Sequence, residues 1–275
     1  MSAIEFAPAK VNLTLHVTGR RADGYHLLDS LVVFPQTGDS VSATPASEPA
    51  LTITGPFAEG LETGPDNLVL RAAALCDAPP HALTLTKNLP VASGIGGGSA
   101  DAAATLRLLT RLTGTALPDR TKILDLGADI PVCLDGRSCR MSGIGEVIDP
   151  VTLPEFHLVL VNPRVAVMTG AVFQGLRSRD NPSMSDPPEF TDLNTFVEFL
   201  RTCRNELEHP AIAVQPVIAD VIAALADTTG CRLARMSGSG ATCYGVFKTA
   251  AESESAVSSL RSTHPNWWVS TGRVA

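Results

Sequence analysis

The sequence has 275 residues, of which 44% are hydrophobic and 18% are charged, and its 21 basic and 28 acidic residues give a net charge of −7. This composition is typical of globular proteins and excludes a wholly disordered chain. The acidic balance argues against nucleic acid as the main partner, because binding to a phosphate backbone requires a surface rich in lysine and arginine. The length favours two domains or one large one.

The sequence contains neither a membrane span nor a recognisable secretion signal. No run of about 18 apolar residues is present, and the first ten residues, MSAIEFAPAK, lack the apolar segment of a signal peptide. The six cysteines form no CxxC pair and show no zinc-ligand spacing to a histidine. We therefore expect a soluble cytoplasmic protein without a membrane partner, with buried free thiols and no protein metal site.

Strands dominate the predicted elements of the first ninety residues. Apolar and polar side chains alternate over residues 11–17, and an apolar run over 31–34 follows the turn-rich stretch 19–24. Residues 51–54 and 83–86 predict two further strands, and the composition of 67–78 between them favours a helix.

The middle of the chain predicts two helices and a domain boundary. The first helix follows the glycines at 94–98, with Ser99 and Asp101 as cap and first-turn residues and Gly114 as its stop. A shorter helix is predicted over 119–126, before Gly127. The Asp-Pro pair at 149–150 predicts a boundary between a domain over 1–150 and a second over 151–275.

The second half of the chain mixes helices and strands. Strands are predicted over 156–161 and 267–274, and a strand, glycine-rich turn and strand over 232–247. Helices are predicted over 195–204, from Pro216 to a stop at Gly230, and over 250–261. Residues 177–192 hold three prolines and predict a mobile surface loop. Because strands and helices do not alternate strictly, we assign the fold class as α+β.

The strongest chemical signal is the segment GIGGGS at 94–99, where a helix begins. Glycines let backbone N–H groups approach an anion closely, and a helix start adds unpaired donors and the positive end of its dipole. This combination favours a phosphate-binding loop, although a plain flexible loop before a helix remains the alternative. No Gly-Lys-Ser/Thr follows, which excludes a Walker A loop, and the poor strand before the glycines argues against a dinucleotide site.

Three segments in chain order resemble the motifs of the GHMP kinases (galacto-, homoserine, mevalonate and phosphomevalonate kinases). They are FAPAKVNLTL at 6–15, PVASGIGGGSADAAA at 90–104 and RMSGSGATCY at 235–244. The segments RRADGYHLL at 20–28 and GADIP at 127–131 resemble the branch that phosphorylates a hydroxyl of a cytidine diphosphate-linked polyol, in a route to isoprenoid precursors. Ala92, Ser93, Ile95 and Ala100 depart from that pattern; the alanine at 100 would remove one side-chain contact to phosphate but leave the backbone cradle.

The resemblance implies a two-domain α+β fold, with a left-handed βαβ unit in the N-terminal domain and a ferredoxin-like C-terminal domain. It implies ATP and Mg²⁺ as cofactors, with Asp129 as the base and Lys10 beside it as an assisting charge. The nucleotide-binding residues that it implies are Asn67, Pro90, Val91, Ala92, Ser93, Gly94, Ile95, Gly96, Gly97, Gly98, Ser99 and Ala100.

For the cytidine-bearing substrate, the resemblance implies a base held between Tyr25 and Phe173, with His26 at its polar edge. The other implied substrate contacts are Asn12, Thr169, Gly238, Ser239 and Gly240. We interpret Asn205 and Glu206 as loop-supporting residues.

Each of these residues also has a purely structural interpretation, such as a surface lysine at 10, a turn cap at 129 or core aromatics at 25 and 173. Two alternative functions stay open, a kinase of the homoserine or mevalonate type and a ligand-binding protein without catalysis. The Tyr-His pair argues against the first, since those substrates have no base to stack, and the presence of both Lys10 and Asp129 argues against the second. The sequence gives no indication of the oligomeric state.

Overall fold

The computed structural model describes residues 3–274 and divides the chain into two compact units. The first unit contains the N-terminal segment up to Ala9 together with Gly38–Val91 and Gly96–Gly136. The second contains Lys10–Thr37, Ala92–Ile95 and the chain from Arg137 onward. The units are therefore discontinuous in sequence, and the domain boundary at residue 150 stays a prediction.

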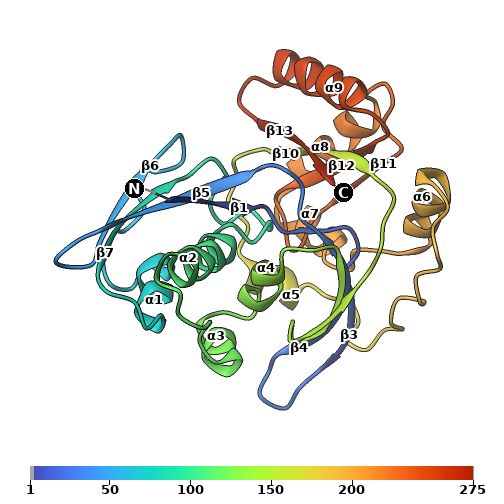
Figure 1. Ribbon diagram of the computed structural model, residues 1–275. Helices are drawn as coiled ribbons and strands as arrows, with labels where there is room; N and C mark the ends of the chain where they lie inside the picture. The colour runs from blue at the N-terminus through green and yellow to red at the C-terminus, as the bar shows by residue number, and fades with distance from the viewer. Residues whose placement is uncertain (1–2, 275) are drawn as a thin grey trace. The chain divides into compact units, whose positions relative to one another are not determined.

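The first unit combines one sheet with helices (Figure 1). The sheet has the strand order β1-β5-β7-β6, in which only the β6–β7 pair is parallel. Because β6 and β7 are joined through α1, they form a βαβ unit. Its elements are β1 (Ala3–Pro8), β5 (Gly38–Pro45), β6 (Ala50–Thr54), α1 (Leu68–Leu75), β7 (His81–Thr86), α2 (Gly97–Thr113), α3 (Arg120–Leu126) and α4 (Ile130–Asp135).

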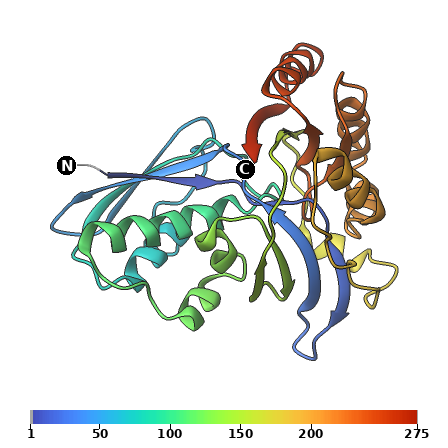
Figure 2. The ribbon, with the colours of Figure 1, turned by 45° about the vertical axis from the view of Figure 1, so that its right-hand side comes forward.

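Strand periodicity decides which side chains of this sheet are buried. Alternate residues of β5 and β7 point to one face, and the buried set is Asp39, Val41, Ala43, His81, Leu83 and Leu85. The helix α2 packs against β1 and β5, and α1 packs against α2 (Figure 2). Four alanines of α2, at 100 and 102–104, are almost fully buried, and their small side chains permit this close packing.

The predicted strands over 51–54 and 83–86 and the helices over 67–78 and 119–126 are confirmed, with the bounds just given. The predicted start of α2 is wrong. Its N-cap is Gly96, in the left-handed region at φ 63°, and Gly97 is already helical. Ser99 therefore lies inside the first turn, and Asp101 lies beyond it and is buried.

The second unit contains two sheets. One has the order β2-β4-β8-β9, with β3 paired to β4, and the other has the order β11-β12-β10-β13. The elements are β2 (Val11–Asn12), β3 (His16–Arg20), β4 (His26–Val33), β8 (Cys139–Gly143), β9 (Val147–Pro150), β10 (Phe156–Asn162), α5 (Thr169–Gln174), α6 (Leu193–Thr202), α7 (Glu208–Val214), α8 (Val217–Ala226), β11 (Leu233–Met236), β12 (Cys243–Phe247), α9 (Ala250–Thr263) and β13 (Trp268–Val274).

The second of these sheets has the ferredoxin-like arrangement. Along the chain, β10 is followed by helices, the β11–β12 hairpin, α9 and β13, and every neighbouring pair in the sheet is antiparallel. The helix α8 packs on β11 and β12, and α9 packs on β10 and β13. Apolar residues of β10 and α8, including Val159, Val161, Ile218 and Val221, belong to one buried cluster. The predicted α+β class and ferredoxin-like unit are confirmed.

The single strand predicted over 11–17 is wrong, because the chain forms two short strands, β2 and β3, with irregular backbone between them. All seven residues are buried, polar ones included. The hydroxyl of Thr14 accepts the N–H of Leu31 at 2.8 Å, and the side chain of Asn12 donates to Ser30 at 2.7 Å. Polar side chains thus replace part of the strand-to-strand hydrogen bonding.

Most other elements of this unit agree with their predicted positions, except at two places. The helix α8 ends at Ala226 rather than at Gly230, which lies in the following turn at φ 88°. Residues 177–192 contain no helix or strand, as predicted, but they are not simply a surface loop. Met184 is buried, and both its N–H and Arg140 bond to the carboxylate of Asp29.

Candidate active site

Three sequence motifs meet within the second unit. The N–H of Lys10 donates to the carbonyl of Ile95 at 2.9 Å, and the N–H of Asn12 donates to the hydroxyl of Ser237 at 3.0 Å. That hydroxyl donates in turn to the carbonyl of Gly94 at 3.2 Å. Residues widely separated in sequence are therefore joined at one place, by a backbone hydrogen bond and by the side-chain hydroxyl of Ser237.

The two glycine loops of this unit interlock backbone to backbone. A Cβ on Gly94, at φ 74°, would lie 2.7 Å from the carbonyl oxygen of Gly240, and a Cβ on Gly238, at φ 56°, would lie 2.7 Å from the carbonyl oxygen of Gly94. Neither position tolerates a side chain. At Gly94 the glycine thus serves the contact with residues 237–240, in addition to any role toward an anion.

The start of the helix that follows the first glycine loop belongs to the first unit. The earliest backbone bond within α2 runs from the N–H of Ala100 to the carbonyl of Gly96, so the N–H groups of Gly97, Gly98 and Ser99 have no partner within the helix. A Cβ on Gly98 would meet only the side chain of Leu68, at 3.6 Å. These donors and the helix dipole form an anion-binding geometry that fits a phosphate group.

A buried charge cluster lies beneath this helix start. The ammonium of Lys87 contacts Asp39 at 2.5 Å and Asp101 at 2.7 Å, and all three side chains are at most 5% exposed. Asp39 also accepts the N–H groups of Asn88 and Leu89. The second oxygen of Asp101, Oδ1, is buried without a hydrogen-bond partner.

Two carboxylates share one ammonium in this cluster, and the pKa values of Asp101 and Lys87 reflect it. Burial raises the pKa of Asp101 to about 7; the attraction of Lys87 opposes this shift, and the Asp39 carboxylate adds to it. Burial alone would lower the pKa of Lys87, but the two carboxylates outweigh it and raise that pKa. Asp101 is therefore the carboxyl of this cluster whose charge changes near neutral pH, while Lys87 stays protonated.

The two residues predicted to catalyse belong to different units. Lys10 is 5% exposed at the beginning of the second unit. Asp129, half-buried in the first unit, is the N-cap residue of α4, and its side chain makes no capping hydrogen bond. Asp129 therefore occupies the N-cap position of α4, as the structural interpretation expects, but its carboxylate does not cap the helix.

Asn67 caps the helix α1. Its side-chain oxygen accepts the N–H of Val69 at 2.9 Å, and its side-chain nitrogen donates to the carbonyl of Glu62 at 2.7 Å. Both ends of the amide thus have structural partners, while the implied contact with adenine stays a prediction. In the predicted nucleotide segment, Val91 is 51% exposed and Ala92 adopts a left-handed φ of 49°.

Two of the three residues predicted for the cytidine base lie together. The rings of His26 and Phe173 stack with centroids 4.5 Å apart and an interplanar angle of 15°. Tyr25 is 59% exposed, and the ring against Phe173 is His26 rather than Tyr25. Burial, with smaller effects from Arg20 and Arg179, lowers the pKa of His26, so the ring is neutral at pH 7.

The remaining predicted substrate contacts lie on the same loops. The hydroxyls of Thr169 and Ser239 are 3.0 Å apart. The side chain of Asn205 donates to the carbonyls of Met236 and Gly238, both at 2.9 Å, and so shapes the second glycine loop. The loop-supporting interpretation of Asn205 is confirmed. Sequence reasoning missed Ser237, although it lies inside a recognised motif.

Within residues 3–274, no three histidine, cysteine, aspartate or glutamate side chains come together as a metal site. In that same range, no helix is both long and apolar enough to cross a membrane. Five of the six cysteines are buried and Cys231 is half-buried.

Comparison with known families decides the class of protein. The family model "GHMP kinases N terminal domain" matches residues 67–147, and "GHMP kinases C terminal" matches residues 188–266. The chain belongs to the GHMP kinase family. It is therefore a kinase, a phosphotransferase that uses ATP.

Full-length relatives place this kinase in one branch of the family. It is 56% identical to a "4-diphosphocytidyl-2-C-methyl-D-erythritol kinase" of Cereibacter sphaeroides over 98% of both chains, and 56% identical to one of Ruegeria pomeroyi over 99% of both. A crystal structure described as 4-(cytidine 5′-diphospho)-2C-methyl-D-erythritol kinase superposes with a TM-score of 0.81 at 31% identity and covers 99% of each chain. A homoserine kinase of Cytophaga hutchinsonii, at 17% identity and a TM-score of 0.65 over 100% of this chain and 94% of its own, shares the fold.

Proposed function

We propose that this kinase transfers the γ-phosphoryl group of ATP to the 2-hydroxyl of 4-diphosphocytidyl-2-C-methyl-D-erythritol, giving the 2-phosphate and ADP in the methylerythritol phosphate route to isoprenoid precursors. The 56% identity to relatives of that name, over 98% of both chains, carries the proposal. The hydrogen bonds that join Asn12 and Gly94 to Ser237 support it, because they bring parts of all three motifs together.

The phosphate groups of ATP bind to the backbone donors of Gly97, Gly98 and Ser99 at the start of α2. The N–H groups of this first turn, which have no partner within the helix, and the small size of the glycines support the assignment. Pro90, Val91 and residues 92–96, with Ala100, complete the nucleotide segment, and Asn67 flanks the adenine.

Asp129 acts as the base. In the reaction the bond from the acceptor oxygen to the γ-phosphorus forms, the bond from that phosphorus to the bridging oxygen of ADP breaks, and the proton of the hydroxyl passes to the carboxylate. Because phosphoryl transfer has a loose transition state, this proton becomes acidic only late, and a carboxylate can accept it. Lys10 supplies the assisting positive charge, which offsets the charge that develops on the transferred group.

The cytidine end of the substrate is held by Tyr25, His26 and Phe173. The stacked rings of His26 and Phe173 support a binding site for the cytosine base, because a flat aromatic base packs well on aromatic ring faces. Asn12, Thr169 and the loop Gly238, Ser239 and Gly240 provide the polar contacts. The hydroxyls of Thr169 and Ser239 lie 3.0 Å apart, which supports the assignment of both residues to the same group of contacts.

Mg²⁺ neutralises phosphate charge in kinases of this kind. In the part of the chain that is described, no cluster of carboxylates or histidines fits a protein-held ion, so we assign no residue to it and derive no step from it.

The test is a comparison of substrates with purified protein and ATP–Mg²⁺. We expect phosphorylation of 4-diphosphocytidyl-2-C-methyl-D-erythritol at least a hundredfold faster, in kcat/KM, than that of mevalonate or homoserine. The position of the new phosphate is read by phosphorus NMR. Comparable rates on the three alcohols would refute the assigned substrate.

A further inference from the structure

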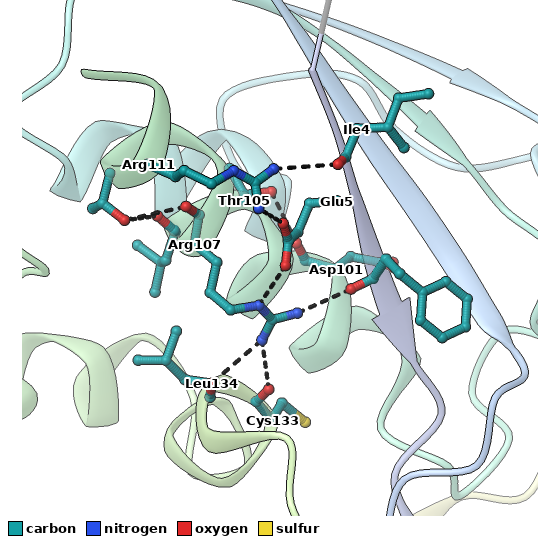
Figure 3. Close-up of polar contacts among 11 residues, drawn as sticks. Ile4, Glu5, Asp101, Thr105, Arg107, Arg111, Cys133 and Leu134 are labelled. Carbon is teal, nitrogen blue, oxygen red and sulfur yellow. Dashed lines mark hydrogen bonds and ion pairs between the residues drawn. The ribbon is translucent and has the colours of Figure 1, made fainter. Parts of the chain in front are cut away.

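Arg107, on the third turn of α2, makes polar contacts with two other elements of the first unit (Figure 3). Its Nε donates to Glu5 of β1 at 2.8 Å, and its Nη2 donates to the carbonyl of Phe6 at 2.9 Å. Its Nη1 donates to the carbonyl of Cys133 in α4 at 2.8 Å and contacts that of Leu134 at 3.4 Å. One planar guanidinium thus joins α2, β1 and α4.

The contact with α4 falls on carbonyls that the helix itself cannot satisfy. α4 has six residues, and the last four carbonyls of any helix have no partner within it. The N–H of Gly136 bonds to the carbonyl of Val132, and Arg107 takes the next two. A cation at this end also interacts favourably with the helix dipole.

A helix this short does not fix its own position, because its few internal bonds barely offset the cost of forming it. Its placement depends on its buried side chains and on contacts such as that of Arg107. Asp129 is the N-cap residue at the opposite end, about 6–8 Å along the axis from the anchored carbonyls at the rise of an α-helix. Any tilt of α4 about its anchored end therefore moves the carboxylate.

We propose that Arg107 is a positioning residue for phosphoryl transfer, which holds α4 against α2 and β1 and thereby keeps Asp129 in place. The inference rests on the proposed role of Asp129 as the base. Arg107 is not a substrate contact and acts only through α4. Displacement of a reacting group by about 1 Å can cost a hundredfold in rate, so a modest loosening of α4 is enough to slow the reaction.

Arg111 provides a matched control one turn further along α2. It also pairs with the carboxylate of Glu5, and it donates to the carbonyl of Ile4 at 3.2 Å. The contacts found for it lead only to β1, so Arg111→Gln removes a charge of the same network while leaving the anchor of α4 intact.

The experiment compares Arg107→Gln, Arg107→Ala, Arg107→Lys and Arg111→Gln in the full-length protein, by steady-state kinetics and by amide hydrogen exchange. For Arg107→Gln we expect kcat to fall roughly 10- to 100-fold, with KM for both substrates within twofold of wild type. Arg107→Lys should recover part of the loss, and added guanidinium should raise kcat of Arg107→Ala. Arg111→Gln should keep kcat within twofold.

Hydrogen exchange tests the anchor without any substrate. The amides of Cys133 and Gly136 should exchange at least tenfold faster in Arg107→Gln and at the wild-type rate in Arg111→Gln. An unchanged exchange rate would overturn the anchor, and a wild-type kcat in Arg107→Gln would overturn the positioning role. If the wild-type protein itself fails to phosphorylate the substrate, the proposed function is wrong, and the exchange rates still decide whether Arg107 holds α4.

Discussion

The buried cluster of Lys87, Asp39 and Asp101 makes the stability of the fold depend on pH. Asp101 has a pKa raised to about 7 by burial, whereas the same group in the unfolded chain titrates near 3.8. Between these values the folded protein binds more protons than the unfolded chain, so the free energy of unfolding falls as the pH rises. About one pH unit above the pKa of Asp101, the cost of the buried charge is nearly complete.

The size of this effect follows from the shift of about three pKa units. At about 1.4 kcal/mol per unit, deprotonation of Asp101 lowers the free energy of unfolding by up to about 4 kcal/mol between pH 4 and pH 8. Asp101→Asn is nearly isosteric and carries no ionisable proton. Its amide oxygen can accept from Lys87, and the remaining pair of Lys87 and Asp39 has no net charge.

The assay is urea unfolding of wild type and Asp101→Asn at several pH values from 5 to 8. We expect the stability of the variant relative to wild type to rise by about 2 kcal/mol from pH 5 to pH 7, because Asp101 in the folded protein is half ionised at pH 7. The difference between the two proteins cancels the other titrating groups. A constant difference across this range would refute the reasoning.

Asp39→Asn is the matched control, because Asp39 belongs to the same cluster but has different partners. Its Oδ1 accepts two backbone N–H groups and its Oδ2 faces the ammonium, so an amide NH₂ must oppose one set of donors. We expect this variant to be destabilised throughout the pH range, by about 2–4 kcal/mol. Two variants with the same pH dependence would argue against a special role for Asp101.

The remaining predictions concern catalysis, substrate binding and the glycine loops. Asp129→Asn should abolish turnover while calorimetry finds near-normal binding of a nonhydrolysable ATP analogue; near-normal turnover would exclude the base role. Tyr25→Ala should raise KM for the cytidine substrate about 2- to 10-fold with little change in kcat, and an unchanged KM would count against stacking. Gly94→Ala should cost about 2–5 kcal/mol in urea unfolding, since its Cβ would meet Gly240 at 2.7 Å. Ala92→Gly, at φ 49°, should change stability by less than about 1 kcal/mol; equal effects at the two positions would contradict the interlock.

The sequence was most informative where one periodicity or one turn residue decides the local structure. The strand over 83–86 alternates cleanly between buried and half-buried residues, and Gly114 ends α2 as predicted. The prediction over 11–17 was wrong because alternation of residue type did not reflect alternation of exposure. There the polar side chains are buried as well, and their partners lie on distant segments.

The charged residues of the first unit were missed, although strand periodicity contained a signal for them. Asp39 continues the inward-facing series of Val41 and Ala43, and Lys87 continues that of Leu83 and Leu85. A charged residue in such a series requires an opposite charge nearby. Its partner could not be identified from sequence alone, because the pairing depends on which strands are neighbours. The role of Arg107 was likewise invisible, since α4 is too short to give a helical periodicity.

The route of the chain through its two units has a consequence for synthesis on the ribosome. Residues 28–32 of β4 pair with residues 139–143 of β8, and the N–H of Asn12 donates to the hydroxyl of Ser237. Residues near the N-terminus therefore form these contacts only after much later residues have been synthesised. At about 5–20 residues per second, more than 200 residues separate Asn12 from its partner by roughly 10–45 seconds. The nascent N-terminal segment therefore lacks this partner until residue 237 has been synthesised. Premature termination before residue 237 would release a chain that contains two of the three motifs but lacks the contacts that join them.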